Sequence, residues 1–489
     1  MYNYQKGGKA LKNQLRTYIL ILVMAVASAF ITINAEANSD LTTTASQQLY
    51  GNNFSMAIRD LNTGELVYEY YGNNSIKPAS TLKLLTASSA LKVLGENYFF
   101  STQMLIDGTV QNGILNGNIY LRGEGDPTLQ VKDFVTFSNT LKKKGIKQIN
   151  GNIFGDDTWF TGDRLSPGVL PEDETHHYGA PISALTTSPD NDYDVSTVIV
   201  TAQASRVGFA PSISVQPNLS GLNLINKAKT GKKGTKNTLT ISRKYRTNQV
   251  IVSGNLPQGS SKKEWVSMFN PTLSTLYSFK NTLVAQGIKF GNSSKVDYGT
   301  VPSHAVSLGT KRSQPLKQIM PAFMKLSNNG IADILVKTMG KKVHNIGDWE
   351  HGLKVIRDYG QSIGLDMNQW KFEDGSGISH NNRVSAIQQT YLLVKQPKEP
   401  YYGTFLNSLP LGGQRDRLIG GTLRNRFTDS SYKNRIIAKT GTLDGVADLS
   451  GYLQGKSGRW YAFSILVEHP KSSYTSQIDT VVKKIITSY

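Results

Sequence analysis

Residues 78–95, PASTLKLLTASSALKVLG, place a proline, a serine and a lysine at the start of an amphipathic segment. Apolar side chains recur there at helical spacing, and Gly95 is typical of the residue that ends a helix. Pro78 stands where helix starts favour proline. Ser80 and Lys83 are three residues apart, so a helix places both side chains on one face of its first turn, where the helix dipole favours negative charge.

The Ser80-x-x-Lys83 pattern indicates a nucleophile with its base. A serine attacks an amide only when one group removes its proton and another stabilises the oxyanion. A lysine serves as that base when burial or a neighbouring cation keeps it neutral. The motif is short, and three other pairs have the same spacing without a loop that enters a helix start: Ser89/Lys92, Ser260/Lys263 and Ser430/Lys433.

Two further elements strengthen this interpretation. Ser327-Asn328-Asn329 precedes the amphipathic IADILVKTMG, and Lys439-Thr440-Gly441 follows the strand-like RIIA and precedes Thr442. Each has a second match, Ser379-His380-Asn381 and Lys229-Thr230-Gly231, but the latter lies in a lysine run and precedes Ser-x-Asn. Three elements in the order Ser-x-x-Lys, Ser-x-Asn, Lys-Thr-Gly are the pattern of serine acyl-transfer enzymes that recognise penicillin.

The N-terminus predicts export. Four cations up to Arg16 precede the uncharged apolar run YILILVMAVASAFITI, which ends near Ala35-Glu36-Ala37, a small-x-small cleavage pattern. We expect a signal peptide over residues 1–37 and a periplasmic mature protein. An uncleaved anchor is the alternative, although the run is shorter than the about 20 apolar residues of a span. The chain has no cysteine, which excludes a lipoprotein anchor and disulfides.

The charge is strongly basic. The formal net charge is +19, and removal of a leader that holds four cations and one anion leaves +16. Such a surface is attracted to polyanions, and it is compatible with loose association with the membrane or the cell wall. The alternative is a solvated surface that serves solubility. Export and the lack of a basic stripe interleaved with aromatics argue against nucleic acid as a partner.

The chain alternates between sheet and helix patterns. Residues 54–71 predict two strands around an Asn62-Thr63-Gly64 turn, and residues 98–307 consist of short strands and turns. Segments 274–287 and 316–340 have helical periodicity, and three strands over 435–468 precede a final helix. One face of that helix carries Ile478, Val481, Val482, Ile485 and Ile486. We expect it to pack on the sheet, with a membrane-surface role as the alternative.

The chain resembles the class C low-molecular-mass penicillin-binding proteins, D-alanyl-D-alanine carboxypeptidases with endopeptidase activity of peptidase family S13. Beyond the three motifs, the resemblance rests on LRGEGDPTL (121–129), GDDTWF (155–160), YGAPISAL (178–185), EDGSGIS (373–379) and GTLRNRF (421–427). It covers the whole mature chain, including the long insert that shorter β-lactamases and carboxypeptidases lack.

The resemblance implies an α+β fold: a penicillin-binding, serine β-lactamase-like domain, with an antiparallel sheet flanked by helices. Residues 38–97 and 308–489 are expected to form this catalytic domain. A β-rich insertion, domain II, is expected over 98–195 and 265–307, and a smaller nested domain III over 196–264. The oligomeric state does not follow from the sequence.

The resemblance also implies residue roles. Ser80 corresponds to the acylated nucleophile and Lys83 to its base. Ser327 corresponds to the relay that protonates the leaving D-alanine, and Asn329 to the group that holds the substrate amide. Lys439 and Thr440 correspond to the residues that bind the terminal carboxylate of the substrate. The backbone N–H groups of Ser80 and Thr442, beside Gly441, correspond to the groups that stabilise the oxyanion. The implied partners are peptidoglycan stem peptides and β-lactams, with no cofactor or metal.

One position departs from the family. Relatives commonly carry an arginine after the second serine of DGSGxS, which binds the side-chain carboxylate of the diamino acid; here it is His380, with Arg383 nearby. Histidine is a weaker and pH-dependent partner for an anion. A surface-loop histidine is the alternative interpretation. Asp156, or else Asp157, is expected to supply the acid of this pocket.

Rival functions lack their own motifs. A Ser-His-Asp hydrolase needs a Gly-x-Ser-x-Gly elbow, which the sequence lacks, and Gly375-Ser376-Gly377 favours a turn. The histidines available to such a hydrolase are His176, His177, His304, His344, His351, His380 and His469. His176-His177 lacks the His-Glu-x-x-His spacing of a metal site. A serine β-lactamase, which needs a device for fast deacylation, and a non-catalytic wall-binding scaffold remain as alternatives.

Overall fold

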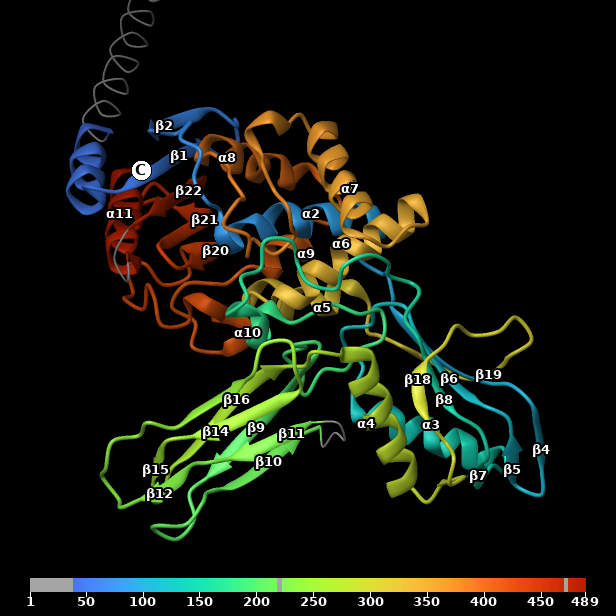
Figure 1. Cartoon of the computed structure of the whole chain (residues 1–489). Helices are drawn as coiled ribbons and strands as arrows, with labels where there is room; N and C mark the ends of the chain where they lie inside the picture. Colours follow the sequence, from blue (N-terminus) through green and yellow to red (C-terminus); the bar gives the residue numbers. More distant parts are fainter. Residues whose placement is uncertain (1–37, 218–221, 470–473) are drawn as a thin grey trace, which may run out of the picture.

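The computed structural model describes residues 38–217, 222–469 and 474–489, so the predicted leader lies outside the described residues. Both ends of the chain contribute to one five-stranded antiparallel sheet (Figure 1). Its order is β2 (Leu66–Tyr70), β1 (Asn53–Asp60), β22 (Trp460–Glu468), β21 (Val446–Gln454), β20 (Ile436–Leu443). β1 pairs with β22 from Asn53 opposite Glu468 to Asp60 opposite Tyr461. The predicted α+β class with an antiparallel sheet is confirmed.

Helices cover both faces of this sheet. The last helix, α11 (Thr475–Ser488), buries its apolar stripe together with Leu41, Ala45 and Leu49 of the helical residues 38–49. The predicted packing of this helix is confirmed, and its role as a membrane-surface foot is wrong because the apolar face is covered. The other face carries a larger core from α2 (Lys83–Leu94), α5 (Leu316–Lys325), α6 (Asn329–His344), α7 (Trp349–Ser362), α8 (Ala386–Lys395) and α9 (Tyr402–Ser408).

A long insertion interrupts this part of the fold after α2, and the chain returns to it before α5. It contains a five-stranded sheet, β18 (Val296–Tyr298), β8 (Ile153–Asp156), β6 (Ile119–Gly123), β3 (Ser101–Ile106), β19 (Val306–Arg312). A four-stranded sheet accompanies it: β17 (Lys289–Phe290), β7 (Gln148–Ile149), β5 (Ile114–Asn116), β4 (Thr109–Gln111). α3 (Val131–Lys143) and α4 (Pro271–Ala285) pack together over this core.

A second, all-β body interrupts the insertion. It contains β10 (Ser212–Gln216), β9 (Thr197–Gln203) and β16 (Ser261–Ser267); β11 (Asn223–Asn226), β14 (Gln249–Ser253) and β13 (Thr240–Arg243); and the pair β12 (Lys229–Gly231) and β15 (Asn255–Pro257). Two strands cross the boundaries predicted from the sequence, β19 at 307/308 and β16 at 264/265. Because each pairs along its length inside its own sheet, we propose ends at 312 and 267 instead.

Short helical turns complete the fold: η1 (Ala79–Leu82), η2 (Asp173–Thr175), η3 (His177–Gly179), η4 (Met367–Gln369), η5 (Gln396–Lys398), α10 (Arg417–Gly420) and η6 (Gly421–Leu423). Within the described ranges, every helix is too short or too polar to span a bilayer.

Candidate active site

The three motifs, far apart in the sequence, meet at one cleft of about 540 Å³. Ser80 comes from η1, Ser327 and Asn329 from the junction of α5 and α6, and Thr442 from β20. Two larger cavities, of about 680 and 790 Å³, lie elsewhere and are lined by none of these residues. We therefore take the smaller cleft as the candidate active site, because the motif residues line it.

Ser80 and Lys83 are joined directly. The segment that carries Ser80 is a 3₁₀ turn rather than the first turn of an α-helix, and α2 begins only at Lys83. In a 3₁₀ turn, side chains three residues apart eclipse each other, and Lys83 Nζ donates to Ser80 Oγ at 2.9 Å. Ala79 has a φ of +41°, and Gly377 packs so closely on it that a Cβ at 377 would lie 1.8 Å from the Ala79 carbonyl oxygen.

Lys83 is fully buried, yet no carboxylate within the described ranges contacts its amino group. Besides Ser80, it donates to Asn329 Oδ1 at 2.6 Å and to the Ser376 carbonyl at 2.5 Å. Burial lowers the pKa of Lys83 to about 7, against the opposing pull of Asp333 and Asp374. Near neutral pH, a substantial fraction of Lys83 is thus the free amine that a base requires.

A second buried lysine holds the second serine. Lys439 Nζ donates to Ser327 Oγ at 2.8 Å and to the Thr440 carbonyl at 2.9 Å. Burial, with a smaller contribution from the charge of Lys83, depresses the pKa of Lys439 well below its usual range. Ser327 has a φ of +62°, a left-handed conformation that a serine adopts only when its surroundings impose it. Asn328 helps to impose it, since its side chain accepts from Ile331 N–H and donates to residues 192–194.

β20 runs along the other side of the cleft. Thr440 Oγ1 donates to Thr422 Oγ1 at 2.9 Å, and Thr442 lines the cleft itself. A Cβ on Gly441 would lie 2.7 Å from an Asp448 carboxylate oxygen and 2.8 Å from the Pro78 carbonyl. Glycine at 441 therefore lets the strand lie against the segment that carries Ser80.

A loop from the insertion forms the remaining wall. Leu170, Glu172, Asp173 and Tyr178 line the cleft, and Asn329 Nδ2 donates to the Tyr178 carbonyl at 2.8 Å. Burial and the nearby Asp173 carboxylate raise the pKa of Tyr178 to about 12. Sequence reasoning missed this wall because its contacts with the cleft are tertiary.

The wall is fastened to the nested β body through Glu174. Its carboxylate accepts from Arg243 Nη2 of β13 at 2.5 Å, and both side chains are buried. The Glu174 carbonyl accepts from the same nitrogen at 2.9 Å and from Ser267 Oγ at 2.5 Å. A continuous set of contacts therefore links β13 through Glu174 and the loop to Asn329.

Asp374 and Asp333 are further residues that sequence reasoning missed. The Asp374 carboxylate accepts from the N–H groups of Ser376, Gly377 and Ser379, which shapes the loop whose carbonyl binds Lys83. Burial raises the pKa of Asp374. Burial also raises the pKa of Asp333 well above its usual range, and the charge of Asp374 raises it further. The sequence offered one signal for each residue. Asp374 lies in EDGSGIS, which favours an Asx turn, and Asp333 is an acid within the apolar IADILV of α6.

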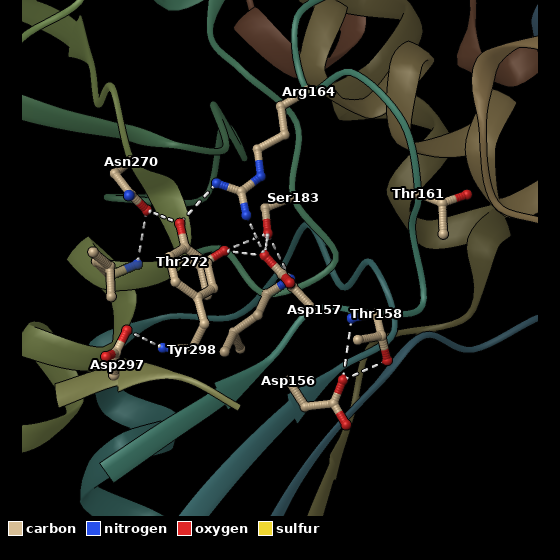
Figure 2. A network of polar contacts seen from close by, with 12 residues as sticks. Asp156, Asp157, Thr158, Thr161, Arg164, Ser183, Asn270, Thr272, Asp297 and Tyr298 are labelled. Atoms are coloured by element: carbon tan, nitrogen blue, oxygen red, sulfur yellow. Dashed lines mark hydrogen bonds and ion pairs between the residues drawn. The ribbon is translucent and has the colours of Figure 1, made fainter. Parts of the chain in front are cut away.

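The acid predicted at Asp156 is not in the cleft. One Asp156 oxygen accepts from Thr158 N–H and Oγ1, and the other from Val301 N–H, so the carboxylate serves the insertion's own fold. The alternative, Asp157, is bound by Arg164, Thr272 and Ser183, as Figure 2 shows. The acids that line the cleft are Glu172, Asp173 and Asp444.

His380 lines the cleft, whereas Arg383 does not. Arg383 Nη1 donates to the His380 and Asn382 carbonyls at 2.6 and 2.7 Å, which directs it into its own loop. Two competing motif matches lie elsewhere: Lys92 pairs with Glu399, and Lys229-Thr230-Gly231 forms β12. Ser379 stands between Ile378 and His380 at the edge of the cleft, but its Oγ donates to Glu373. No cluster of three or more metal-ligating side chains occurs among the residues that the structure describes.

Comparison with known proteins adds independent support. Residues 36–485 match the model of the D-Ala-D-Ala carboxypeptidase 3 (S13) family. The chain is 34% identical to a D-alanyl-D-alanine carboxypeptidase of Actinomadura sp. (strain R39), over 84% of this chain and 77% of the relative. It is 25% identical to D-alanyl-D-alanine carboxypeptidase DacB of Haemophilus influenzae, over 91% and 90% of the two chains.

Solved structures agree on the fold. The crystal structure of penicillin binding protein 4 (dacB) from Haemophilus influenzae superposes with a TM-score of 0.77 at 23% identity, over 91% of this chain and 97% of that one. The same protein was also solved in complex with a β-lactam. A predatory endopeptidase from Bdellovibrio bacteriovorus matches with a TM-score of 0.51 at 16% identity, over 88% and 92% of the chains.

Proposed function

The chain belongs to the D-Ala-D-Ala carboxypeptidase 3 (S13) family and is a serine-type DD-peptidase of peptidoglycan, and from that premise we propose that its acyl-enzyme forms on Ser80. The observation that carries the proposal is the 2.9 Å contact between Ser80 Oγ and a buried Lys83 whose pKa is about 7. A β-lactam presents a comparable amide to the same serine, so acylation by β-lactams belongs to the proposal.

Acylation starts with transfer of the Ser80 hydroxyl proton to the neutral Lys83 amine as Oγ attacks the carbonyl carbon of the penultimate D-alanine. The tetrahedral oxyanion accepts from the backbone N–H groups of Ser80 and Thr442. The C–N bond then breaks, the leaving amine takes a proton through Ser327, and D-alanine departs. Water hydrolyses the Ser80 ester, and the stem peptide leaves as a carboxylate.

Lys439 and Thr440 bind the terminal carboxylate of the substrate in this proposal. Lys439 already contacts Ser327 at 2.8 Å, so one amino group can orient the relay serine and bind the carboxylate, whose negative charge favours the protonated form of the lysine. Asn329 contacts both Lys83 and the Tyr178 carbonyl, which fixes the amide plane that meets the substrate.

The cleft suits a side-chain amine better than a side-chain carboxylate. Among the residues that the structure describes, Glu172, Asp173 and Asp444 line it, and no arginine does. His380 is the only residue of the predicted anion-binding pair that lines it. We therefore propose that stem peptides with lysine, or with an amidated diamino acid, react faster than those with a free side-chain carboxylate.

Hydrolysis of defined muropeptides tests the function. The wild type should release D-alanine from a pentapeptide and split a crosslinked dimer, and the ratio of the two rates measures the carboxypeptidase and endopeptidase contributions. Ser80→Ala should lose both. Ser430→Ala is the matched control, because Ser430 is exposed and also stands three residues before a lysine. Equal activity of Ser80→Ala and the wild type would refute the proposal.

Periplasmic location is also a proposal, supported by the substrate and by the leader pattern. Expression of the full chain should yield an envelope-fraction protein whose N-terminus is Asn38. A mature protein that starts before residue 38 would favour the uncleaved anchor, and one found in the cytosol would contradict export.

A further inference from the structure

The positive charge of this chain is concentrated in the nested β body. Between residues 196 and 267 there are eleven lysines and arginines and a single acid, Glu264, which accounts for about half of the net charge of +19. The charge of Arg243 is compensated by its buried ion pair with Glu174. The excess therefore resides in the exposed side chains.

Five of these eleven cations gather at one end of this body. We call that end the basic tip: the loop 204–211, β12 and the turn 232–238. The loop is bonded to β12 through Gly208 N–H to the Thr230 carbonyl at 2.9 Å and Thr230 N–H to the Phe209 carbonyl at 2.8 Å. The turn folds onto β15, since Asn255 Nδ2 donates to the Lys236 carbonyl at 2.8 Å. Its exposed cations are Arg206, Lys229, Lys232, Lys233 and Lys236.

These five cations lack acidic partners. In the part of the chain that the structure describes, no ion pair joins any of them to a carboxylate. Uncompensated like charges held together by a β framework repel one another. An anionic surface laid against the tip relieves that repulsion and gains attraction from several charges at once.

Two apolar side chains project from the same tip. Phe209 is 53% exposed and Val207 36%, on either side of Gly208, whose φ of +87° turns the loop. The guanidinium of Arg206 lies 4.0 Å from the centre of the Phe209 ring. A soluble anionic polymer offers nothing to a phenyl ring and an isopropyl group, whereas the boundary between headgroups and acyl chains accepts both.

We propose that the basic tip docks onto a membrane surface that contains anionic lipid, with Phe209 and Val207 inserted among the headgroups and the lysines around them. Each lysine or arginine near such a surface adds about 1 kcal/mol of attraction. The tip lies at the end of the molecule away from the catalytic sheet (Figure 1). Docking there keeps the five-stranded sheet of both chain ends at the far end of the molecule from the lipid.

The test is sedimentation of the full mature protein with vesicles of phosphatidylcholine, with and without one-third phosphatidylglycerol. The wild type should bind only the anionic vesicles, and less well as salt rises. A Lys232→Gln, Lys233→Gln, Lys236→Gln variant should bind about 100-fold more weakly. A Val207→Ser, Phe209→Ser variant should lose about 10-fold or more.

Matched controls separate the tip from general surface properties. Lys142→Gln, Lys143→Gln, Lys144→Gln removes three exposed lysines at the C-terminal end of α3, and Val284→Ser, Val306→Ser removes two exposed valines of the insertion. Both should bind vesicles like the wild type. Hydrolysis of a soluble pentapeptide should be unchanged in all four variants, which verifies that they fold.

Two results overturn the proposal. One is equal binding of the wild type and the lysine variant to anionic vesicles. The other is capture by soluble poly(glycerol phosphate) as strong as by vesicles and unaffected by Val207→Ser, Phe209→Ser, which assigns the tip to an acidic polymer instead.

Discussion

Two lysines determine the chemistry that the cleft can perform. Lys83 and Lys439 are both fully buried, and each donates to a motif serine. The nearby acids, Asp333 and Asp374, act on Lys83 through the field rather than by contact. Lys83 therefore changes protonation near neutral pH, in the range in which a base is most effective.

The rate of acylation should follow the neutral fraction of Lys83. Because its pKa is lowered to about 7, the second-order rate constant with a fluorescent penicillin should fall about tenfold per pH unit below pH 7 and level off above it. Stopped-flow measurement across this range gives the midpoint. A flat profile would contradict the role of Lys83 as base.

Asp333→Asn should move that midpoint to lower pH. The Asp333 carboxylate raises the pKa of Lys83, so its removal lets burial depress that pKa further. Asp358→Asn, an exposed residue paired with Lys354, should leave the midpoint in place. A shift to higher pH in Asp333→Asn would reverse the assigned sign.

His380→Arg should change substrate preference rather than rate in general. An arginine supplies a permanent bidentate partner for a carboxylate. We expect kcat/KM for peptides with a free side-chain carboxylate to rise about tenfold or more relative to lysine peptides, measured on paired substrates. The same change for both substrates would place residue 380 outside the specificity pocket.

At the scale of elements, a buried ion pair is part of the connection between the nested β body and the wall of the cleft. Glu174 joins η2 to Arg243 of β13, and the loop that follows supplies Tyr178, whose carbonyl orients Asn329. Both side chains of the pair are buried, so loss of one partner leaves a charge without compensation. The nested body thereby positions the wall of the cleft.

Glu174→Gln should lower stability and weaken peptide binding. The uncompensated Arg243 costs about 3 kcal/mol or more, and the loosened wall should raise KM for a pentapeptide several-fold. Acylation by benzylpenicillin, a compact ligand that depends less on this wall, should change little. Thermal unfolding and steady-state kinetics measure both effects.

Asp479→Asn is the control for that prediction. It removes the carboxylate partner of Arg426, in a half-buried pair that joins the segment before Phe427 to α11, away from the cleft. It should lower the unfolding temperature without changing KM. An equal rise in KM in both variants would show that lost stability, not the position of the wall, is responsible.

At the scale of the molecule, the fold and most of the site were predicted from the order of motifs and strand patterns along the sequence. The three motifs occur in sequence on a helix start, a loop and a strand, and strands at both termini carry patterns that close one sheet. Those are local patterns, so the sequence predicted them. Contacts such as Asp156 with Val301, 145 residues apart, are not local, and for that reason the sequence could not show that the Asp156 carboxylate is bound within the insertion.

Mass spectrometry of the intact mature protein after benzylpenicillin tests the central claim, the acyl-enzyme on Ser80. The account predicts a single persistent adduct of the antibiotic, mapped to Ser80 by peptide digestion and absent from Ser80→Ala. Rapid turnover of the antibiotic without an adduct would instead indicate a β-lactamase. Neither adduct nor turnover, or an adduct on another residue, would contradict the claim.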